Sequence, residues 1–298
     1  MRRGIPVYVT GADALGVVIA TRNRRASLLR TVQHLVELPE RPRVVVVDNG
    51  STDDSARAVR SAFPGVTVVP LPANVGAAAR TVGALALATP LVAFSDDDSW
   101  WSPGSLERAA ELFAARRSLG LVAGRILVGP DQRPDPTCAQ MAASPLPRHP
   151  GQPGSAILGF VACAAVVRRE AFLHAGGFHP RVGVGGEETL LALDLASLGW
   201  ELSYVDDVVA HHDPPSATPR PAREATVLRN RLWAAWLRRP AFAAAAETAR
   251  AVAAAPAPAA ARGLAEAARG LPWIRRSRRV VPPEVERDVR RLRAARAA

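Results

Sequence analysis

Short apolar runs alternate with amphipathic segments along the first part of the chain. The apolar runs are rich in β-branched residues, which predicts buried strands over 16–20, 43–48, 66–70 and 91–94. The segments between them predict helices over 26–38, 53–62 and 76–88. Apolar strands that alternate with helices are typical of an α/β fold, in which a parallel sheet carries helices on both faces.

The remaining part of the chain falls into two regions of different character. The first continues the alternation, with helices predicted over 105–117, 168–174 and 189–198, and strands over 120–128, 157–167 and 200–209. Within it, residues 129–155 are rich in Pro, Gly and Ser, which predicts a mobile loop. The second region begins at about Pro214 and predicts helices over 223–238 and 284–297, on either side of an Ala-rich stretch that Pro256 and Pro258 interrupt. We therefore expect an N-terminal extension (1–14), a sheet domain (15–216) and an α-helical C-terminal region (217–298).

The positive charge is confined to the C-terminal region. The formal charge of the chain is +11, but residues 1–219 carry a net −1 and residues 220–298 a net +12. An arginine-rich helical tail suits the surface of an anionic membrane, a nucleic acid, or a solvated face packed on the rest of the protein. Nucleic acid is the least favoured of these partners, because no recognised binding motif accompanies the arginines.

The basic residues and the cysteines exclude several kinds of chemistry. All 38 basic residues are arginine, so a phosphate-binding loop with a lysine and Schiff-base catalysis are both excluded. The two cysteines, Cys138 and Cys163, have no metal-ligand spacing and fit a reducing compartment. No apolar run reaches the roughly 18 residues that a membrane-spanning helix needs. We therefore expect a cytoplasmic protein.

Polar clusters follow each of the first four predicted strands. They are Thr21-Arg22-Asn23, Asp48-Asn49-Gly50, Asn74 to Gly76, and Asp96 to Asp98. Because ligands of parallel α/β sheets bind at the carboxyl ends of the strands, this pattern predicts a single crevice.

Three consecutive aspartates close the fourth strand. Asp96, Asp97 and Asp98 repel one another unless a cation lies between them, and carboxylate oxygens are the ligands that Mg²⁺ and Mn²⁺ prefer. The alternative is a solvated acidic turn. His211 and His212, which follow a later strand on the same side of the sheet, are each either a further metal ligand or a structural histidine.

Two glutamates are the candidates for a general base. Glu187 and Glu188 precede an apolar helix, where acidic residues also simply complement the helix dipole. Gly185 and Gly186 before them would let a substrate approach closely, which favours proton transfer by one of the carboxylates.

Three further side chains have both a binding and a structural interpretation. Trp100 and Trp101, next to the aspartates, would stack on a sugar ring or belong to the core. Arg80 would contact a phosphate or a base, or be an exposed helical arginine.

Taken in order, these motifs resemble those of family 2 glycosyltransferases. The matching stretches are Thr21–Arg24, Val47–Asp53, Asn74–Gly76, Asp96–Asp98 and Gly186–Glu188. The resemblance implies the GT-A fold and a metal-binding Asp-x-Asp (DXD) motif in the aspartate triplet. It also implies transfer with inversion at the anomeric carbon.

The resemblance covers roughly residues 15–216 and implies a role for each matching residue. It places a nucleotide-sugar half at about 15–104 and an acceptor half at about 105–216. The nucleotide would contact Thr21, Asn23, Asp48, Arg80, Asp96 and Asp97. The metal, Mn²⁺ or Mg²⁺, would be held by Asp98 and Asp96, with His211 or His212 as a further ligand. The acceptor would lie against Trp100, Trp101, Gly185 and Gly186.

The catalytic base is where this chain departs from the family pattern. The family usually has Glu-Asp or Asp-Asp here, with the second residue as base. That residue is Glu188 in this chain, one methylene longer, and Glu187 is the alternative.

The predicted activity is transfer of a hexose or deoxyhexose from a nucleoside-diphosphate sugar to a hydroxyl of a sugar, lipid-linked or small-molecule acceptor. Such a reaction belongs to polysaccharide, glycolipid or glycoconjugate synthesis. Residues 220–298 would then bring the enzyme to the inner face of the membrane. The alternatives are a nucleotidyltransferase on a similar sheet, whose usual glycine-rich loop is absent from Thr21–Arg24, and a nucleic-acid-binding protein acting through the tail.

Overall fold

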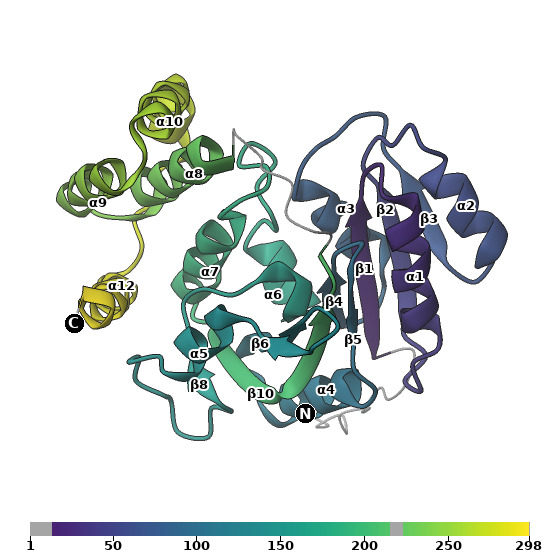
Figure 1. The fold of residues 1–298 in the computed structure, drawn as a ribbon. Helices are drawn as coiled ribbons and strands as arrows, with labels where there is room; N and C mark the ends of the chain where they lie inside the picture. Colours follow the sequence, from purple (N-terminus) through teal and green to yellow (C-terminus); the bar gives the residue numbers. More distant parts are fainter. Residues whose placement is uncertain (1–13, 215–222, 298) are drawn as a thin grey trace, which may run out of the picture.

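A ten-stranded sheet lies at the centre of the computed structural model, which describes residues 14–214 and 223–297 (Figure 1). Eight of its strands follow one path, in the order β3-β2-β1-β4-β9-β6-β10-β5. The strands are β1 (Leu15–Thr21), β2 (Arg43–Asp48), β3 (Thr67–Pro70), β4 (Leu91–Ser95), β5 (Ser99–Trp101), β6 (Leu119–Val128), β7 (Arg133–Pro134), β8 (Ser155–Ala156), β9 (Ala165–Arg168) and β10 (Glu201–His212). The helices of the sheet domain are α1 (Arg25–Val36), α2 (Ser55–Ala62), α3 (Ala78–Ala86), α4 (Ser105–Ala115), α5 (Pro136–Ala142), α6 (Arg169–His174) and α7 (Glu187–Ser197).

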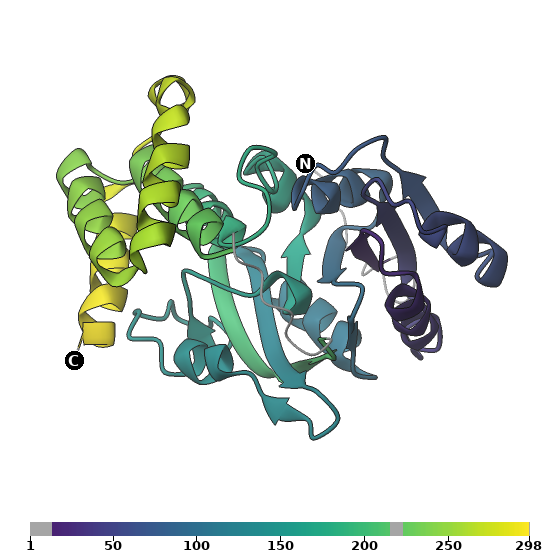
Figure 2. The same cartoon turned by 45° about the horizontal axis from the view of Figure 1, so that its top comes forward.

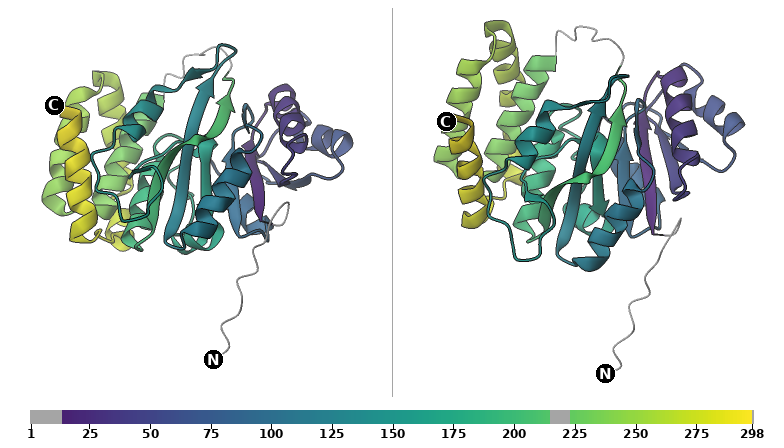
Figure 3. Two further views of the ribbon diagram at one scale, coloured as in Figure 1. Left: turned by 90° about the horizontal axis from the view of Figure 1, so that it is seen from below. Right: turned by 60° about the horizontal axis from the view of Figure 1, so that its bottom comes forward.

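The sheet is mostly parallel and bears helices on both faces, as predicted (Figure 3). The strands β1 to β4 run parallel, and so do β6 and β10. Between these two groups β9 is antiparallel to both of its neighbours, so the two groups point the same way. The carboxyl ends of β1, β2, β4, β6 and β10 therefore share one edge of the sheet.

The predicted strand over 157–167 is found only at its end. The paired strand is β9, Ala165–Arg168, and residues 162–164 before it form a short 3-10 helix. The reason lies in the neighbours: β4 and β6 pair only with residues 165–168, so the preceding backbone has no partner in the ladder.

The segment 129–155 is more ordered than the predicted loop. It contains α5, which begins at an N-cap formed by Asp135, whose carboxylate accepts the backbone N–H of Thr137 (2.8 Å). Pro136 occupies the first turn, where its missing N–H costs nothing. The buried amide of Gln152 then ties the end of this segment to the Leu202 carbonyl of β10 (3.1 Å). These caps and anchors are side-chain contacts that composition alone does not reveal.

The C-terminal region forms a helical layer beside α7, at the end of the sheet remote from β1–β3 (Figures 1 and 2). Its helices are α8 (Arg223–Arg238), α9 (Ala241–Ala254), α10 (Ala257–Arg269), α11 (Leu271–Ser277) and α12 (Pro283–Ala297). The apolar stripe of α8 packs with Trp273 and with Val182 and Leu190 of the sheet domain in one cluster. The layer thus shares its core with the segment around the two glutamates. The boundary near residue 216 stays a prediction. No helix in the described ranges is long and apolar enough to cross a membrane.

Candidate active site

The loops after β1 and β2 are joined by hydrogen bonds at the carboxyl edge of the sheet. Asn23 accepts the backbone N–H of Thr52 (2.7 Å), and its own N–H donates to Ser51 (3.0 Å). Asp48, at the end of β2, accepts the N–H of Ser51 (2.9 Å). These contacts bring Asn23 and Asp48, which the sequence assigned to the nucleotide, to the same edge as the aspartate triplet.

The loop after β3 joins the same edge and meets the glycine turn before α7. Asn49 accepts the N–H of Val75 (2.8 Å) and donates to the carbonyl of Gly76 (3.1 Å). Gly76 has φ +61°, and a Cβ there would lie 2.7 Å from the Cα of Gly183. The two backbones approach so closely that only glycine fits.

Two of the three aspartates lie together with a histidine. Ligand atoms of Asp96, Asp98 and His212 are all within 4.8 Å of one another, and Asp98 is 8% exposed. The Nε2 of His212 is 3.4 Å from Asp98, whose hydrogen bond raises the pKa of His212. Two carboxylates and one imidazole form a donor set that suits Mn²⁺ or a similar divalent ion.

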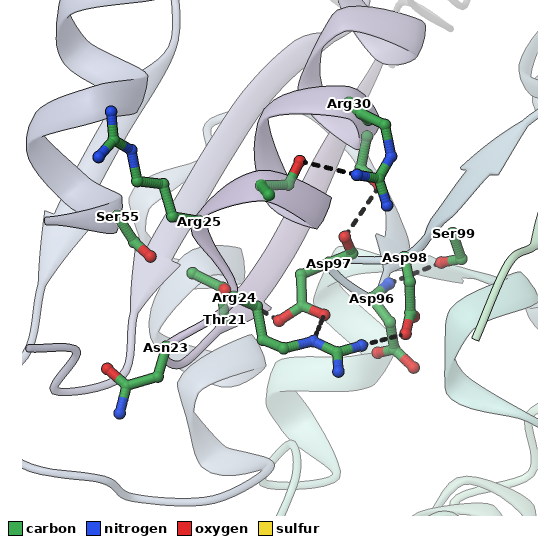
Figure 4. A network of polar contacts seen from close by, with 12 residues as sticks. Thr21, Asn23, Arg24, Arg25, Arg30, Ser55, Asp96, Asp97, Asp98 and Ser99 are labelled. Atoms are coloured by element: carbon green, nitrogen blue, oxygen red, sulfur yellow. Dashed lines mark hydrogen bonds and ion pairs between the residues drawn. The ribbon is translucent and has the colours of Figure 1, made fainter. Parts of the chain in front are cut away.

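The third aspartate turns toward the first loop (Figure 4). Asp97 accepts the hydroxyl proton of Thr21 (2.9 Å) and lies 3.2 Å from the Nε of Arg24. Burial raises the pKa of Asp97 to about 6, against the hydrogen bond from Thr21, and the charges of Asp98 and Asp96 add to the rise. Thr21 and Asp97 therefore hold the loop after β1 against the triplet.

Arg24 supplies a cation to the triplet and is a residue that the sequence interpretation missed. Its Nη2 lies 2.6 Å from Asp98 Oδ2 (Figure 4). A cavity of about 620 Å³ opens beside it, lined in part by Asn23, Arg25, Arg30 and Asp213. Arg24 directly follows the first polar cluster, but arginine is too common in this chain for this one to stand out.

Arg80 links the aspartates to the glutamates. It is 7% exposed and forms an ion pair with Asp96, and its Nη1 lies 3.7 Å from Glu187. Burial alone would lower the pKa of Arg80, but the charges of Asp96 and Glu187 outweigh it and raise that pKa. Its Nε is buried and has no hydrogen-bond partner in the described structure.

The two glutamates differ in what surrounds them. Glu187 is buried against Arg80 and also accepts the backbone N–H of Gly185. Glu188 is half-buried, and burial together with the charge of Glu187 raises its pKa to about 7. A carboxylate with a pKa near neutrality is suited to accept a proton at physiological pH. Because Glu187 already contacts Arg80 and the backbone N–H of Gly185, Glu188 is the better candidate for the general base.

The structure separates the two histidines. Since successive side chains of a strand point to opposite faces, His211 faces away from the aspartates. Its Nε2 is 2.6 Å from Ser102 Oγ and its ring stacks on Trp100. The group of possible ligands in the described residues contains His212 and not His211, which favours His212 among the two alternatives.

The two tryptophans have different surroundings. Trp101 is fully buried in the main core, so it has no surface for an acceptor. Trp100 is half-buried, and its ring stacks with His34 at 4.3 Å and with His211 at 5.5 Å. Its contact with an acceptor stays a prediction. Gly185 and Gly186, by contrast, lie directly beside the glutamates, with φ of +109° and +88°.

Comparisons with known proteins identify the family of this chain. The model of the family described as Glycosyl transferase family 2 matches residues 16–175. An N-acetylglucosaminyl-diphospho-decaprenol L-rhamnosyltransferase of Mycobacterium tuberculosis is 29% identical over 245 residues, which cover 70% of this chain and 80% of that protein. The succinoglycan biosynthesis protein ExoU of Rhizobium meliloti is 37% identical over 94 residues, covering 30% of this chain and 28% of ExoU.

Solved structures show the same fold. The mannosyltransferase PcManGT from Pyrobaculum calidifontis, in complex with GDP-Man and Mn²⁺, has a TM-score of 0.56 at 21% identity and covers 90% of this chain and 83% of its own. S. aureus TarS 1-349 in complex with UDP-GlcNAc has a TM-score of 0.58 at 16% identity, and the match covers 79% of this chain and 69% of the TarS chain. The nucleotidyltransferase and nucleic-acid alternatives find no support in these similarities. Because the family model matches more than half of its residues, the chain belongs to glycosyl transferase family 2, and it is a glycosyltransferase with the GT-A fold.

Proposed function

We propose that this protein transfers a sugar from a nucleoside-diphosphate sugar to an acceptor hydroxyl, with inversion, at the edge formed by the aspartate triplet and Glu188. The observation that carries the proposal is the pair of ionic contacts that link Asp96 through Arg80 to Glu187. Because Glu188 is the next residue, the possible cation site and a carboxylate with a pKa of about 7 belong to one site. Neither group alone would account for transfer.

The donor would bind in the half of the site built by the first four strands. Thr21, Asn23 and Asp48 would face the base and ribose, with Asp97 holding the loop between them. A divalent ion would be held by Asp96, Asp98 and His212, and it would supply positive charge to the departing diphosphate. Arg24 pairs with Asp98, so its guanidinium would have to leave this carboxylate for the ion to bind there. Arg80, which pairs with Asp96 and Glu187, would contact the nucleotide from the side of the glutamates.

The acceptor would bind on the side of the glycine turn. Glu188 would take the proton of its hydroxyl, and the oxygen would attack the anomeric carbon opposite the leaving group. The rhamnosyltransferase relative is named for an acceptor that is a sugar on a diphospho-decaprenol lipid. We propose an acceptor of this lipid-linked class. Val184 supports it, because this side chain, in the glycine turn before the base, is 58% exposed and offers apolar surface.

A thermal-shift screen tests the proposed donor class. UDP-, GDP- and dTDP-sugars are each added with Mn²⁺ or Mg²⁺, and one nucleotide series is expected to raise the melting temperature only when the metal is present. Stabilisation by none of them, or equal stabilisation in the presence of EDTA, would contradict the proposal.

The pH dependence of turnover follows from the pKa of Glu188. Below a pKa of about 7 the carboxylate is protonated and cannot accept a proton. The rate is therefore expected to rise about tenfold per pH unit up to neutrality and then to level off. Initial rates between about pH 5.5 and about pH 9 measure this. A flat profile across neutrality would show that no group of this kind limits the reaction.

The arginine-rich tail is expected to contact an anionic membrane, and its exposed side chains indicate where. Trp233 and Trp273 are buried in the helical layer. What remains exposed on α10 and α11 are arginines beside Leu264 and Leu271. The exposed arginines there are Arg262, Arg269, Arg275 and Arg276. We propose that this surface contacts anionic lipid, where each basic residue contributes about 1 kcal/mol.

Sedimentation with vesicles tests the membrane contact. The protein is expected to sediment with anionic but not with neutral vesicles, and to be released by about 0.5 M salt. Changing Arg269, Arg275 and Arg276 together to Glu should abolish binding, whereas the same change at Arg41, Arg57 and Arg60, exposed on the sheet domain, should not. Equal recovery in the supernatant with and without anionic lipid would rule the contact out.

A further inference from the structure

A buried amide on the C-terminal helices faces the glycine turn of the site. Asn230, in the middle of α8, is 1% exposed. Asparagine is unfavourable inside a helix, and burying its amide costs free energy unless hydrogen bonds replace water. Its partners therefore indicate why an amide occupies this position.

The partners of Asn230 are the turn and the neighbouring arginine. Its Nδ2 donates to the carbonyl of Gly185 (2.8 Å), and its Oδ1 accepts from Nε (3.0 Å) and Nη2 (2.9 Å) of Arg229. The same Nη2 donates to the carbonyl of Val182 (3.0 Å). Two adjacent residues of α8 thus hold the turn at two points.

The turn needs such anchors because its own residues supply little constraint. Gly183, Gly185 and Gly186 all have positive φ, at +75°, +109° and +88°. Glycine adopts this conformation readily but also leaves it readily, since it has no side chain to pack. External hydrogen bonds are then what select one conformation.

The anchored turn leads directly to the reactive groups. The N–H of Gly185 donates to Glu187, which lies beside Arg80, and Arg80 pairs with Asp96. A shift of Gly185 would move the start of α7, and with it Glu188. On the other side, Arg229 lies over the ring of Trp233 (4.6 Å) and 3.4 Å from Glu266 of α10. The anchor is itself fixed by the helical layer.

We infer that Asn230, supported by Arg229, is a positioning residue: it holds the Gly183–Gly186 turn so that Glu188 faces the acceptor hydroxyl. The C-terminal helices are then part of the catalytic apparatus as well as a surface for docking. This inference rests on the proposed function, because it takes Glu188 as the base.

Two substitutions in the full-length protein test the role. Asn230→Ala removes both hydrogen-bonding groups, and Asn230→Asp keeps the size and the acceptor for Arg229 but removes the donor to Gly185. The turnover rate is measured from the release of nucleoside diphosphate, with the UDP-, GDP- or dTDP-sugar that serves as donor. We expect kcat to fall about 10- to 100-fold in both variants, the scale of a misplaced reacting group. KM for the donor should stay within about two-fold, since the donor half is untouched.

A matched control separates positioning from loss of stability. Thr248→Val removes the partner of Trp236 Nε1 (3.0 Å) within the same helical layer, without touching the turn. It should lower the melting temperature but leave kcat unchanged. An equal loss of kcat in Thr248→Val, a rise in KM alone, or a kcat within about two-fold of wild type in both Asn230 variants would overturn the inference.

A parallel Glu188→Gln variant distinguishes the failure of this inference from failure of the proposed function. If Glu188→Gln is impaired and the Asn230 variants are not, only the positioning role is wrong. If Glu188→Gln is also unimpaired, the assignment of Glu188 as the base is wrong, and so is the positioning role of Asn230 that depends on it.

Discussion

Replacing Asp98 by Asn is expected to abolish turnover while the fold survives. Asp98 is the aspartate that both His212 and Arg24 approach, and it is nearly buried. The amide has the same shape but lacks the charge that attracts a divalent ion. Stabilisation of the charge on the leaving diphosphate by a metal ion contributes several kcal/mol to lowering the barrier. The turnover rate should therefore fall by more than about a hundredfold. Release of nucleoside diphosphate with saturating metal measures it.

Asp207→Asn is the matched control for this prediction. Asp207 lies on the same strand as His212, but it is exposed and pairs only with Arg108 in the described structure (2.8 Å). Its replacement should leave turnover unchanged. Turnover by Asp98→Asn at the wild-type rate would show that the aspartate group is not the metal site.

The second large effect is expected from Glu188→Gln. The amide cannot accept a proton, and loss of a general base typically costs about 10²- to 10⁴-fold in rate. Donor affinity should hardly change, because the carboxylates that pair with Arg80 in the described structure are Asp96 and Glu187, not Glu188. Single-turnover rates and donor titrations with each variant measure the two quantities separately.

Glu187→Gln provides the comparison, because Glu187 holds Arg80 and Gly185. This variant should lose rate through displaced neighbours but keep the rise in rate toward neutral pH. Glu188→Gln should lose that rise altogether. The reverse pattern would assign the base to Glu187.

The architecture and the crevice could be predicted because both depend on local patterns. Uniformly apolar strands that alternate with helices predict a parallel sheet, and the polar clusters after Thr21, Asp48 and Asp96 mark its carboxyl edge. The position of His212 beside Asp98 also followed from this rule. Side chains alternate between the two faces along a strand, which places His212, and not His211, on the side of the aspartates.

What could not be predicted depends on contacts between distant residues. Arg24 reaches Asp98 across 74 positions, and Asn230 reaches Gly185 across 45. Nothing in the sequence near either residue signals such a partner. The surroundings of Trp100 could not be predicted for the same reason: the rings that stack with it, those of His34 and His211, come from other elements.

The interrupted strand over 157–167 is a further example. Its residues are apolar enough for a strand, but pairing depends on how far the neighbouring strands extend beside it. Periodicity describes which face a side chain prefers and does not reveal where a partner ends.

One measurement tests the central claim most directly: release of nucleoside diphosphate from UDP-, GDP- and dTDP-sugars by the full-length protein, with Mn²⁺ and with EDTA. The account predicts that one nucleotide series is turned over only with the metal, and that Asp98→Asn and Glu188→Gln each remove this activity. Turnover that persists in EDTA, or that is unaffected by both substitutions, would contradict it.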